Sequence, residues 1–293
     1  MTSVIIAAHN EESLIGATLD ALLADSADDT PAIIVVPNGC TDSTAEVARQ
    51  RHVRVVEVAA PGKAAALNAG DQEADSFPRI YLDADIIVPP GGVRTLVDAL
   101  AATGALVAVP ARRLVVQGRP WPVRAYFTIN ERLPVFQLGL FGRGLVAISE
   151  KGRSRFDRFP LVVADDLFLD SLYTDDERVV VPEVEVLVET PHTTRALVRR
   201  LIRVRRGNAA MREHVSLDGP YTVRRADRWA WLRDVVMKDL RLAPAGAVYA
   251  ALSFWAAVWA QRGPRASLAW GRDESTRQRG AAREGLDQLG QDG

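Results

Sequence analysis

The sequence contains very little cysteine and no excess of charge of either sign. Cys40 is the only cysteine among 293 residues, so an internal disulfide and a cysteine-ligated zinc site are both excluded. The 36 Lys and Arg residues are balanced by 37 Asp and Glu residues, which argues against a protein that coats nucleic acid. These features predict a soluble globular protein of a reducing compartment, and we expect it in the cytoplasm.

Long hydrophobic runs are also scarce. The chain opens on an apolar run at residues 4–8 with no basic segment before it, which predicts a first strand rather than a signal peptide. The uncharged stretch 244–260 has 17 residues, fewer than the roughly 20 that a membrane-spanning helix needs. We expect a buried or interfacial helix there. Its aromatic stripe, with Tyr249, Trp255 and Trp259, fits core packing or a homodimer contact more simply than attachment to the inner face of a membrane.

Short apolar runs alternate with segments of helical spacing through the first half of the chain. This order predicts an α/β fold with a mostly parallel sheet built from right-handed βαβ units. Ligands of such sheets bind beyond the carboxyl ends of the strands. The expected strands are residues 4–8, 32–36, 53–58 and 79–83, and the expected helices are residues 11–24, with Asn10 as N-cap, 43–51 and 63–75.

The second half is less regular, and its long connections are expected to be loops that contact the substrate. Further strands are predicted at 105–110, 145–149 and 179–189, and helices at 165–173 and 194–212. The expected loops are residues 121–132 and the glycine-rich stretch 139–144.

Two aspartates follow the predicted strand 79–83. Asp83 and Asp85 form the only Asp-x-Asp triplet in the chain. Strand alternation would place both carboxylates on one side, where two hard oxygen ligands suit one divalent cation, Mg²⁺ or Mn²⁺. A solvated turn is the plain alternative, but the position at a strand's carboxyl end favours a functional role.

A second acidic pair, Asp165 and Asp166, opens an apolar helix. Acids at a helix N-terminus are often there to cap the helix and to interact with its dipole. The functional alternative makes one of them a general base whose pKa is adjusted by burial and by its neighbour.

Basic residues gather in the following segment. Six arginines and no acid lie between residues 195 and 206, and Arg199, Arg203 and Arg206 share one helical face. This pattern favours phosphate binding over a nucleic-acid or membrane surface. Lys63, at a predicted helix start, can contact a diphosphate. His192 is a candidate third metal ligand or diphosphate contact, and otherwise a structural histidine.

Four segments in this order resemble family 2 glycosyltransferases, and the likeness continues more weakly to about residue 212. The resemblance implies the GT-A fold of nucleotide-diphospho-sugar transferases and inversion at the anomeric carbon. The four segments are residues 4–12 (VIIAAHNEE), 35–44 (VVPNGCTDST), 62–70 (GKAAALNAG) and 81–85 (YLDAD).

The resemblance also implies a role for each matching residue. Asp166 corresponds to the base of the usual Glu-Asp pair, here Asp165-Asp166, and Asp83 with Asp85 to the metal-binding triplet. The segment 203–207 (RVRRG) matches the arginine-rich stretch without a Gln-x-x-Arg-Trp sequence, which implies a non-processive enzyme. Donor-binding positions implied by the family are Ala7, His9, Glu11, Asn38, Lys63, Asp83, Arg203 and Arg206.

The motifs leave the donor, the acceptor and the type of activity open. Pro37-Asn38 stands where many members carry an Asp-Asp or Asp-Asn pair, so the donor is of UDP or GDP type. The acceptor is an unknown hydroxyl compound, lipid-linked or a natural product. A sugar-phosphate nucleotidyltransferase and a non-catalytic sugar-nucleotide-binding protein are the alternative functions. The expected organisation is a catalytic domain at 1–215 with halves 1–110 and 111–215, a helical extension at 216–270 and a polar tail at 271–293.

Overall fold

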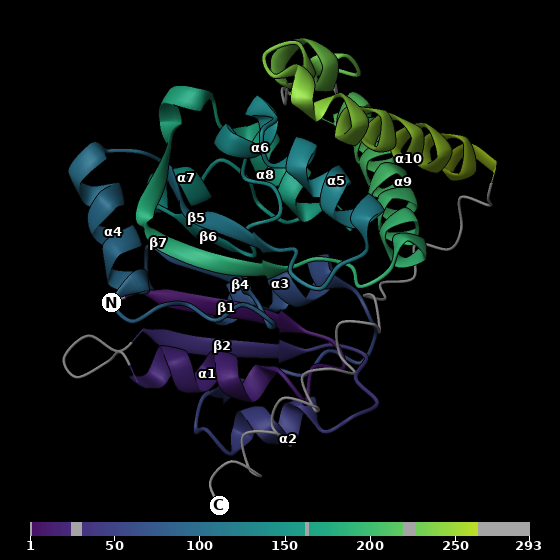
Figure 1. The fold of residues 1–293 in the computed structure, drawn as a ribbon. Coiled ribbons are helices and arrows are strands. Elements are labelled where there is room, and N and C mark those ends of the chain that lie inside the picture. The colour runs from purple at the N-terminus through teal and green to yellow at the C-terminus, as the bar shows by residue number, and fades with distance from the viewer. Residues whose placement is uncertain (1, 25–30, 162–163, 219–226, 263–293) are drawn as a thin grey trace, which may run out of the picture.

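A seven-stranded sheet forms the centre of the protein in a computed structural model that describes residues 2–24, 31–161, 164–218 and 227–262. The strand order is β3-β2-β1-β4-β6-β5-β7 (Figure 1). The strands are β1 (Ser3–Ala8), β2 (Ala32–Pro37), β3 (Arg54–Val55), β4 (Arg79–Asp83), β5 (Val107–Val115), β6 (Leu145–Ile148) and β7 (Arg178–Glu189). The predicted α/β class and GT-A-like architecture are confirmed.

The sheet is mixed rather than wholly parallel, because β6 runs antiparallel to both β4 and β5. The connection from β5 to β6 contains α5 (Trp121–Asn130) and α6 (Pro134–Leu138) and ends in the loop 139–144. That loop lies at the carboxyl end of β4, where Asp83 N donates to Gly144 O over 2.7 Å. The chain therefore re-enters the sheet from the carboxyl edge, and it needs no crossover to place β6 between β4 and β5.

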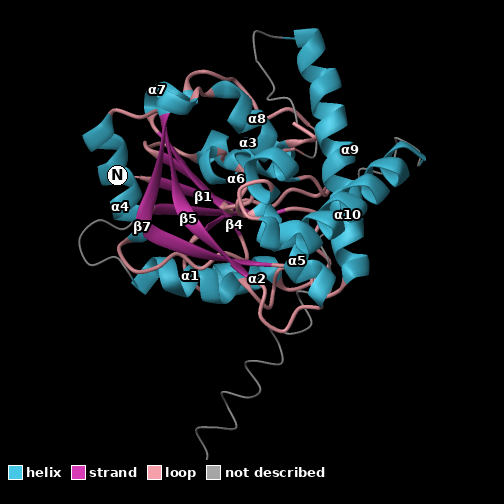
Figure 2. Cartoon of the chain, turned by 45° about the horizontal axis from the view of Figure 1, so that its top comes forward, coloured by secondary structure: helices cyan, strands magenta, loops and turns pink. Residues whose placement is uncertain are grey.

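Alternating side chains of the strands supply two hydrophobic cores, one on each face of the sheet. On one face, Val4 and Ile6 of β1 pack against α1 (Ile15–Ala24), α2 (Thr44–Arg49) and α4 (Gly92–Thr103). On the other, Ile5 and Ala7 pack against α3 (Lys63–Glu73) and α8 (Asp165–Leu172). Figure 2 shows these layers with the sheet between them. Residues that begin α3 and α8 are thereby held at one edge of the sheet.

Some local expectations differ from the structure. Asn10 does not cap a helix, since its Oδ1 accepts from Thr41 N over 2.8 Å and α1 begins at Ile15. Residues 121–132, expected as a loop, are largely the helix α5, whose Val123, Tyr126 and Phe127 are buried. Two short helices complete this half, α7 (Glu150–Arg153) and the 3₁₀ helix η1 (Asp175–Glu177).

The C-terminal helices pack beside α5 rather than on the sheet. They comprise α9 (Thr194–Asp218), the π-helix η2 (Trp231–Val236), the 3₁₀ helix η3 (Leu240–Leu242) and α10 (Ala243–Arg262). Tyr249 of α10 stacks on Tyr126 of α5 with ring centroids 4.8 Å apart. Core packing or a homodimer contact was predicted for the aromatic stripe. Tyr249 packs against α5, whereas Trp255 and Trp259 are exposed, and a homodimer contact stays a prediction. The predicted polar tail 271–293 lies outside the described residues.

Candidate functional site

Three distant parts of the chain meet at Lys63, the first residue of α3. Lys63 Nζ lies 2.8 Å from Asp83 Oδ1 at the end of β4 and 2.6 Å from Asp165 Oδ2 at the start of α8. Each of these side chains is less than one quarter exposed. One ammonium thus neutralises part of the charge of two carboxylates, which holds the N-termini of α3 and α8 against the carboxyl end of β4.

Asp166 lines the same pocket as Lys63, Asp83 and Asp165. Its Oδ2 accepts a hydrogen bond from Gly142 N over 3.0 Å. Burial, followed by the charge of Asp165, raises the pKa of the Asp166 carboxyl to about 7, although Lys63 and the Gly142 N–H favour its charged form. A carboxylate of this pKa at a pocket wall is suited to take a proton near neutral pH. The predicted base is therefore where a base can act.

The loop 139–144 positions the groups around Asp166. Gly142 and Gly144 both have positive φ, at 58° and 67°. A Cβ on Gly144 would lie 2.5 Å from Ile86 Cγ1 and 3.2 Å from Asp83 Oδ2, so only glycine lets the loop pass this close to β4. Sequence reasoning missed the Gly142 contact because the donor is a backbone N–H, although the cluster of glycines marked the loop as unusual.

Two buried charged side chains fix this loop. Arg143 Nε donates to Gly139 O over 3.1 Å, and its guanidinium also donates to Gln137 O and to Pro110 O of β5. Asp170, one turn after Asp166 on α8, accepts from Leu140 N over 3.3 Å. The loop is thus tied to β5 on one side and to α8 on the other, which holds the Gly142 N–H next to the Asp166 carboxylate.

The Asp-x-Asp triplet lies in a turn, so strand alternation does not describe it. β4 ends at Asp83, and Ile86 N donates to Asp83 O over 3.2 Å to close the turn that contains exposed Asp85. Over the residues the structure describes, no three His, Cys, Asp or Glu side chains gather as a metal-binding group. His192 is not part of such a group with Asp83 and Asp85 there, and its role as a metal ligand stays a prediction.

Asp83, which lines the pocket, and exposed Asp85 two residues later still fit a hard cation. Mg²⁺ commonly binds one or two protein carboxylates and takes its other oxygens from water and substrate phosphates, and Mn²⁺ favours the same donors. Asp83 and Asp85 offer such oxygens beside the lysine that suits a diphosphate. The chemistry of this donor pair therefore agrees with a divalent metal shared with a phosphorylated ligand.

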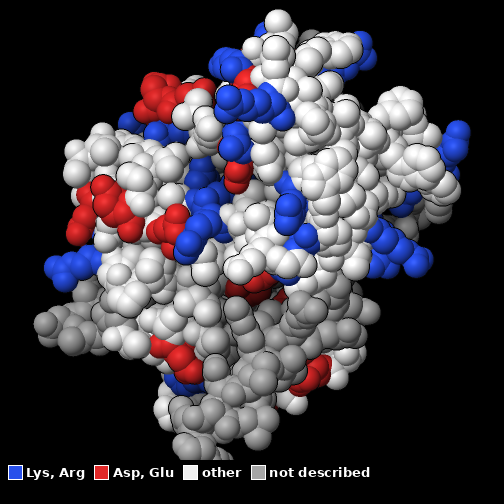
Figure 3. All heavy atoms as spheres, viewed as in Figure 1, with Lys and Arg blue, Asp and Glu red and all other residues white. Residues whose placement is uncertain are grey.

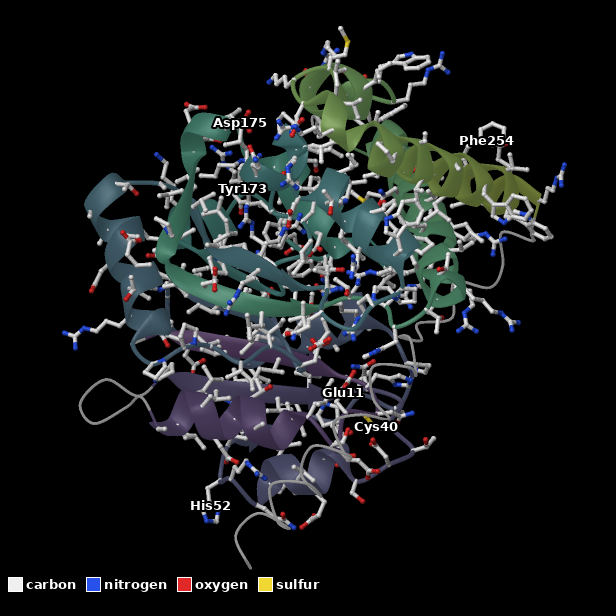
Figure 4. All side chains as sticks on the ribbon, in the orientation of Figure 1. Glu11, Cys40, His52, Tyr173, Asp175 and Phe254 are labelled. Carbon is white, nitrogen blue, oxygen red and sulfur yellow. The ribbon has the colours of Figure 1, made fainter. Side chains whose placement is uncertain are left out.

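The residues predicted to line a nucleoside pocket lie at the ends of β1 and β2, where Glu11 and Cys40 appear near one another in Figure 4. His9 Nδ1 donates to Asn38 O over 2.6 Å, which ties the end of β1 to the end of β2. Ala7 and Glu11 are both buried, and the Glu11 N–H donates to Thr44 Oγ1. The β1–α1 and β2–α2 loops are thus held together.

Asn38 requires a correction, because its side chain faces the protein rather than a ligand. It is fully buried, its Nδ2 donates to Ala8 O over 2.8 Å, and its Oδ1 accepts from Gly62 N over 2.9 Å. Both ends of the amide are used, so it cannot also read a base. Since Gly62 directly precedes Lys63, Asn38 instead fixes the start of α3 and with it the lysine.

Two arginines of α9, Arg203 and Arg206, are predicted to contact the donor. Arg206 donates to Ala260 O and Trp259 O at the end of α10, and its predicted contact with the donor stays a prediction. Arg203 is half-buried.

Arg112 of β5 is a charged residue beside the site that the sequence analysis missed, because the predicted strand stopped at residue 110. Burial and the nearby charge of Arg200 lower the pKa of its guanidinium to about 10, and its Nη1 lies 3.4 Å from Gly142 O.

Comparison with known families decides the class of protein to which this site belongs. The model of glycosyl transferase family 2 matches residues 3–158, which contain β1 to β6, Lys63, the Asp-x-Asp turn and the glycine-rich loop. The chain belongs to glycosyl transferase family 2. It is an enzyme that transfers a sugar from a nucleotide-sugar donor. A comparison with curated proteins returns no significant match.

Solved structures share the fold of this glycosyltransferase at low sequence identity. A mannosyltransferase from Pyrobaculum calidifontis, in complex with GDP-Man and Mn²⁺, has a TM-score of 0.58 and 21% identity, covering 90% of this chain and 76% of its own. Glucosyl-3-phosphoglycerate synthase from Mycobacterium tuberculosis has a TM-score of 0.53 and 21% identity, covering 75% and 81%. Residues 1–349 of TarS from S. aureus, in complex with UDP, give 0.52 and 14%, covering 89% and 92%.

Proposed function

We propose that the protein is an inverting, non-processive glycosyltransferase that uses Asp166 as its general base and a UDP- or GDP-sugar as its donor. The observation that carries the proposal is the Asp166 carboxyl, which lines a pocket with Lys63 and Asp83 and has a pKa of about 7. The family match favours transfer to an acceptor over the nucleotidyltransferase alternative. Two of the structural neighbours carry GDP-Man and UDP, which supports the donor class.

The reaction follows from the charges of these residues. Asp166 accepts the proton of an acceptor hydroxyl, the oxygen forms a bond to the anomeric carbon, and the bond from that carbon to the diphosphate breaks on the opposite face. The leaving diphosphate takes the electron pair, and Lys63 lies where it can stabilise the developing negative charge. Asp165 holds Lys63 in this position and raises the basicity of Asp166.

A divalent cation fits the proposal. Asp83 and Asp85 would hold it, and when bound it would supply positive charge to the diphosphate as the bond to the sugar breaks. The structural neighbours in complex with Mn²⁺ are consistent with this cofactor. Arg203 remains a proposed contact of the donor phosphates on α9.

The decisive experiment separates donor binding from transfer. UDP-, GDP- and TDP-sugars are screened by thermal shift with Mn²⁺ or with EDTA, and the stabilising donor is then offered to candidate hydroxyl acceptors. Stabilisation is expected for one nucleotide class, because a ligand at 100 times its Kd adds about 2.7 kcal/mol to folding stability. EDTA should remove most of the shift.

The variant Asp166→Asn should keep that thermal shift but lose about 10²- to 10⁴-fold in transfer rate. The matched control is Asp98→Asn, an exposed aspartate on α4, which should leave the rate unchanged. Near-normal transfer by Asp166→Asn would remove the residue from the role of base. A donor that binds but is neither transferred nor hydrolysed by the native chain would instead favour the non-catalytic alternative.

A further inference from the structure

The C-terminal cap, residues 227–262, has a higher density of exposed apolar side chains than the rest of the described protein. Six of the twelve exposed large hydrophobic side chains of the described residues lie in this segment. They are Trp229, Met237, Leu240, Phe254, Trp255 and Trp259, with exposed fractions from 46% to 74%. Single exposed apolar residues are ordinary on protein surfaces, but a concentration of aromatic side chains marks a surface that binds something.

The two faces of α10 show why this surface is unusual. Its inner face packs against the protein through Gly246, Tyr249 and Ala256, as expected for the apolar side of a surface helix. Its outer face should then be polar. Instead the exposed positions follow a helical stripe that is also apolar, formed by Ala243, Pro244, Ala247, Ala251, Phe254, Trp255 and Trp259. Phe254 points away from the body of the protein in Figure 4.

The length of the apolar run also exceeds the sequence-based expectation. Residues 240–262 form a 23-residue helical segment that contains an 18-residue window with a mean hydropathy of 1.4, of which only 11% is buried, and by length and composition the segment could cross a membrane. It contains no acidic residue, and its only charges are Arg241 and Arg262, one near each end. The surface along α10 is accordingly white in Figure 3, with blue at its far end.

Basic residues accompany the apolar stripe across the cap. It contains five cations and three aspartates. Asp227 and Asp234 both pair with Arg233, and Asp239 caps η3 by accepting from Arg241 N. The other four cations, Arg228, Lys238, Arg241 and Arg262, therefore leave the cap with a positive charge beside its exposed aromatic side chains.

We propose that the C-terminal cap docks on an anionic lipid surface, with α10 lying in the plane of the interface. Tryptophan and phenylalanine are favoured at the depth of the lipid headgroups, where their rings enter the acyl boundary. Arginine and lysine beside them are attracted to anionic headgroups. The apolar stripe and the cations thus match the two chemical layers of a lipid interface.

A second copy of the chain matches this surface less well. In a two-fold dimer the same patch faces itself, so Lys238, Arg241 and Arg262 would approach cations of the partner copy. The chain after Arg262 also has few apolar side chains that could cover the exposed stripe of α10. Its 31 residues contain only four large apolar ones, Leu268, Trp270, Leu286 and Leu289.

The contacts that α10 makes with the rest of the protein favour a helix that lies on the membrane over a helix that crosses it. Tyr249 stacks on Tyr126 of α5, and Arg206 of α9 donates to the last carbonyls of α10. A spanning helix would have to give up both contacts and the burial of Ala256. An interfacial helix keeps them and covers only its exposed stripe.

Vesicle co-sedimentation of the full chain tests the proposal. The purified protein is mixed with vesicles of phosphatidylcholine alone or with phosphatidylglycerol added, at low and high salt. Binding is expected to the mixed vesicles and to weaken at high salt, because screening shortens the range of the headgroup charge. The double variant Phe254→Gln, Trp255→Gln should bind at least tenfold more weakly, since each ring loses its apolar burial. The double variant Lys238→Gln, Arg241→Gln should lose about fivefold per charge.

The matched control is Leu187→Gln, an equally exposed apolar residue on β7, which should bind vesicles like the native chain. The substituted side chains are exposed, so an unchanged Tm should show that every variant is folded. Failure to bind the mixed vesicles overturns the proposal, as does a native dimer whose formation requires Phe254 and Trp255. Protein that stays with the vesicles after an alkaline carbonate wash overturns it in favour of a spanning helix. None of these results depends on sugar transfer.

Discussion

At the scale of single residues, the site depends on how neighbouring charges and burial act on Asp166. Desolvation and the charge of Asp165 favour the protonated carboxyl, while Lys63 and the Gly142 N–H favour the carboxylate. The balance brings the pKa to about 7, where a carboxylate is basic enough to accept a proton and is still substantially ionised at neutral pH. The raised pKa of Asp166 therefore depends on its burial and on its charged neighbours.

The rate of sugar transfer should depend on pH through the ionisation of Asp166. Transfer should require ionised Asp166, so kcat/KM should fall about tenfold per pH unit below about 7 and level off above it. Lys63→Met removes a charge that lowers the Asp166 pKa, so the midpoint should move to higher pH, whereas Lys63→Arg should leave it nearly unchanged. The measurement is a pH-rate profile of the native chain and both variants. A midpoint that is the same in all three would show that Lys63 does not act on the base.

At the scale of elements, the glycine-rich loop determines whether the site is assembled. Gly144 passes so close to Ile86 and Asp83 that a methyl group would have to displace one of them. The same loop supplies the Gly142 N–H to Asp166 and is fixed by Arg143 and Asp170. Movement of the loop would therefore reach the base and the Asp-x-Asp turn together.

Gly144→Ala should lower both stability and transfer. The left-handed backbone should cost alanine about 1–2 kcal/mol, and the overlap should add about 1–3 kcal/mol. Gly104→Ala is the control, because Gly104 has a similar φ of 69° but no atom within 4 Å of the added methyl group. Urea unfolding of both variants measures the difference. Equal losses would mean that the close contact at Gly144 relaxes without cost.

At the scale of the whole molecule, holding a proton on a buried aspartate links folding stability to pH. The pKa of Asp166 is about 7 in the folded protein against an ordinary value of 3.8, so this group favours folding most below pH 4 and its contribution is lost as pH rises through 7. At pH 8 the folded protein must keep a charge in a buried position. The carboxyl that we propose as the base is therefore expected to reduce stability at the pH at which it would act.

Asp166→Asn should accordingly be more stable than the native chain at pH 8 and no more stable at pH 4. The asparagine Oδ1 can still accept from Gly142 N, so the loop keeps its contact. A gain of about 1 kcal/mol would appear as a Tm rise of about 2–4 °C. Thermal unfolding at both pH values measures it, with Asp98→Asn expected to show no such pH-dependent gain. A Tm below that of the native chain at pH 8 would contradict the raised pKa.

The sequence by itself determined the features that depend on neighbours along the chain. Apolar runs located β1, β2, β4 and β6 to within about a residue, because strand and helix periodicity is a local property. The order of the motifs placed the Asp-x-Asp turn and Lys63 at the carboxyl edge of the sheet, where topology brings such residues together. It also indicated the family that the match then confirmed.

Tertiary structure decided what depends on contacts between distant residues. It turned β6 antiparallel and gave both ends of the Asn38 amide to the protein. It buried Asp166 beside Asp165, which raises the Asp166 pKa, and it brought Lys63 and the Gly142 N–H to the acidic pair, which limits the rise. It also turned Trp255 and Trp259 outward. Composition cannot settle such points, because burial and pairing are set by which faces meet once the chain has folded.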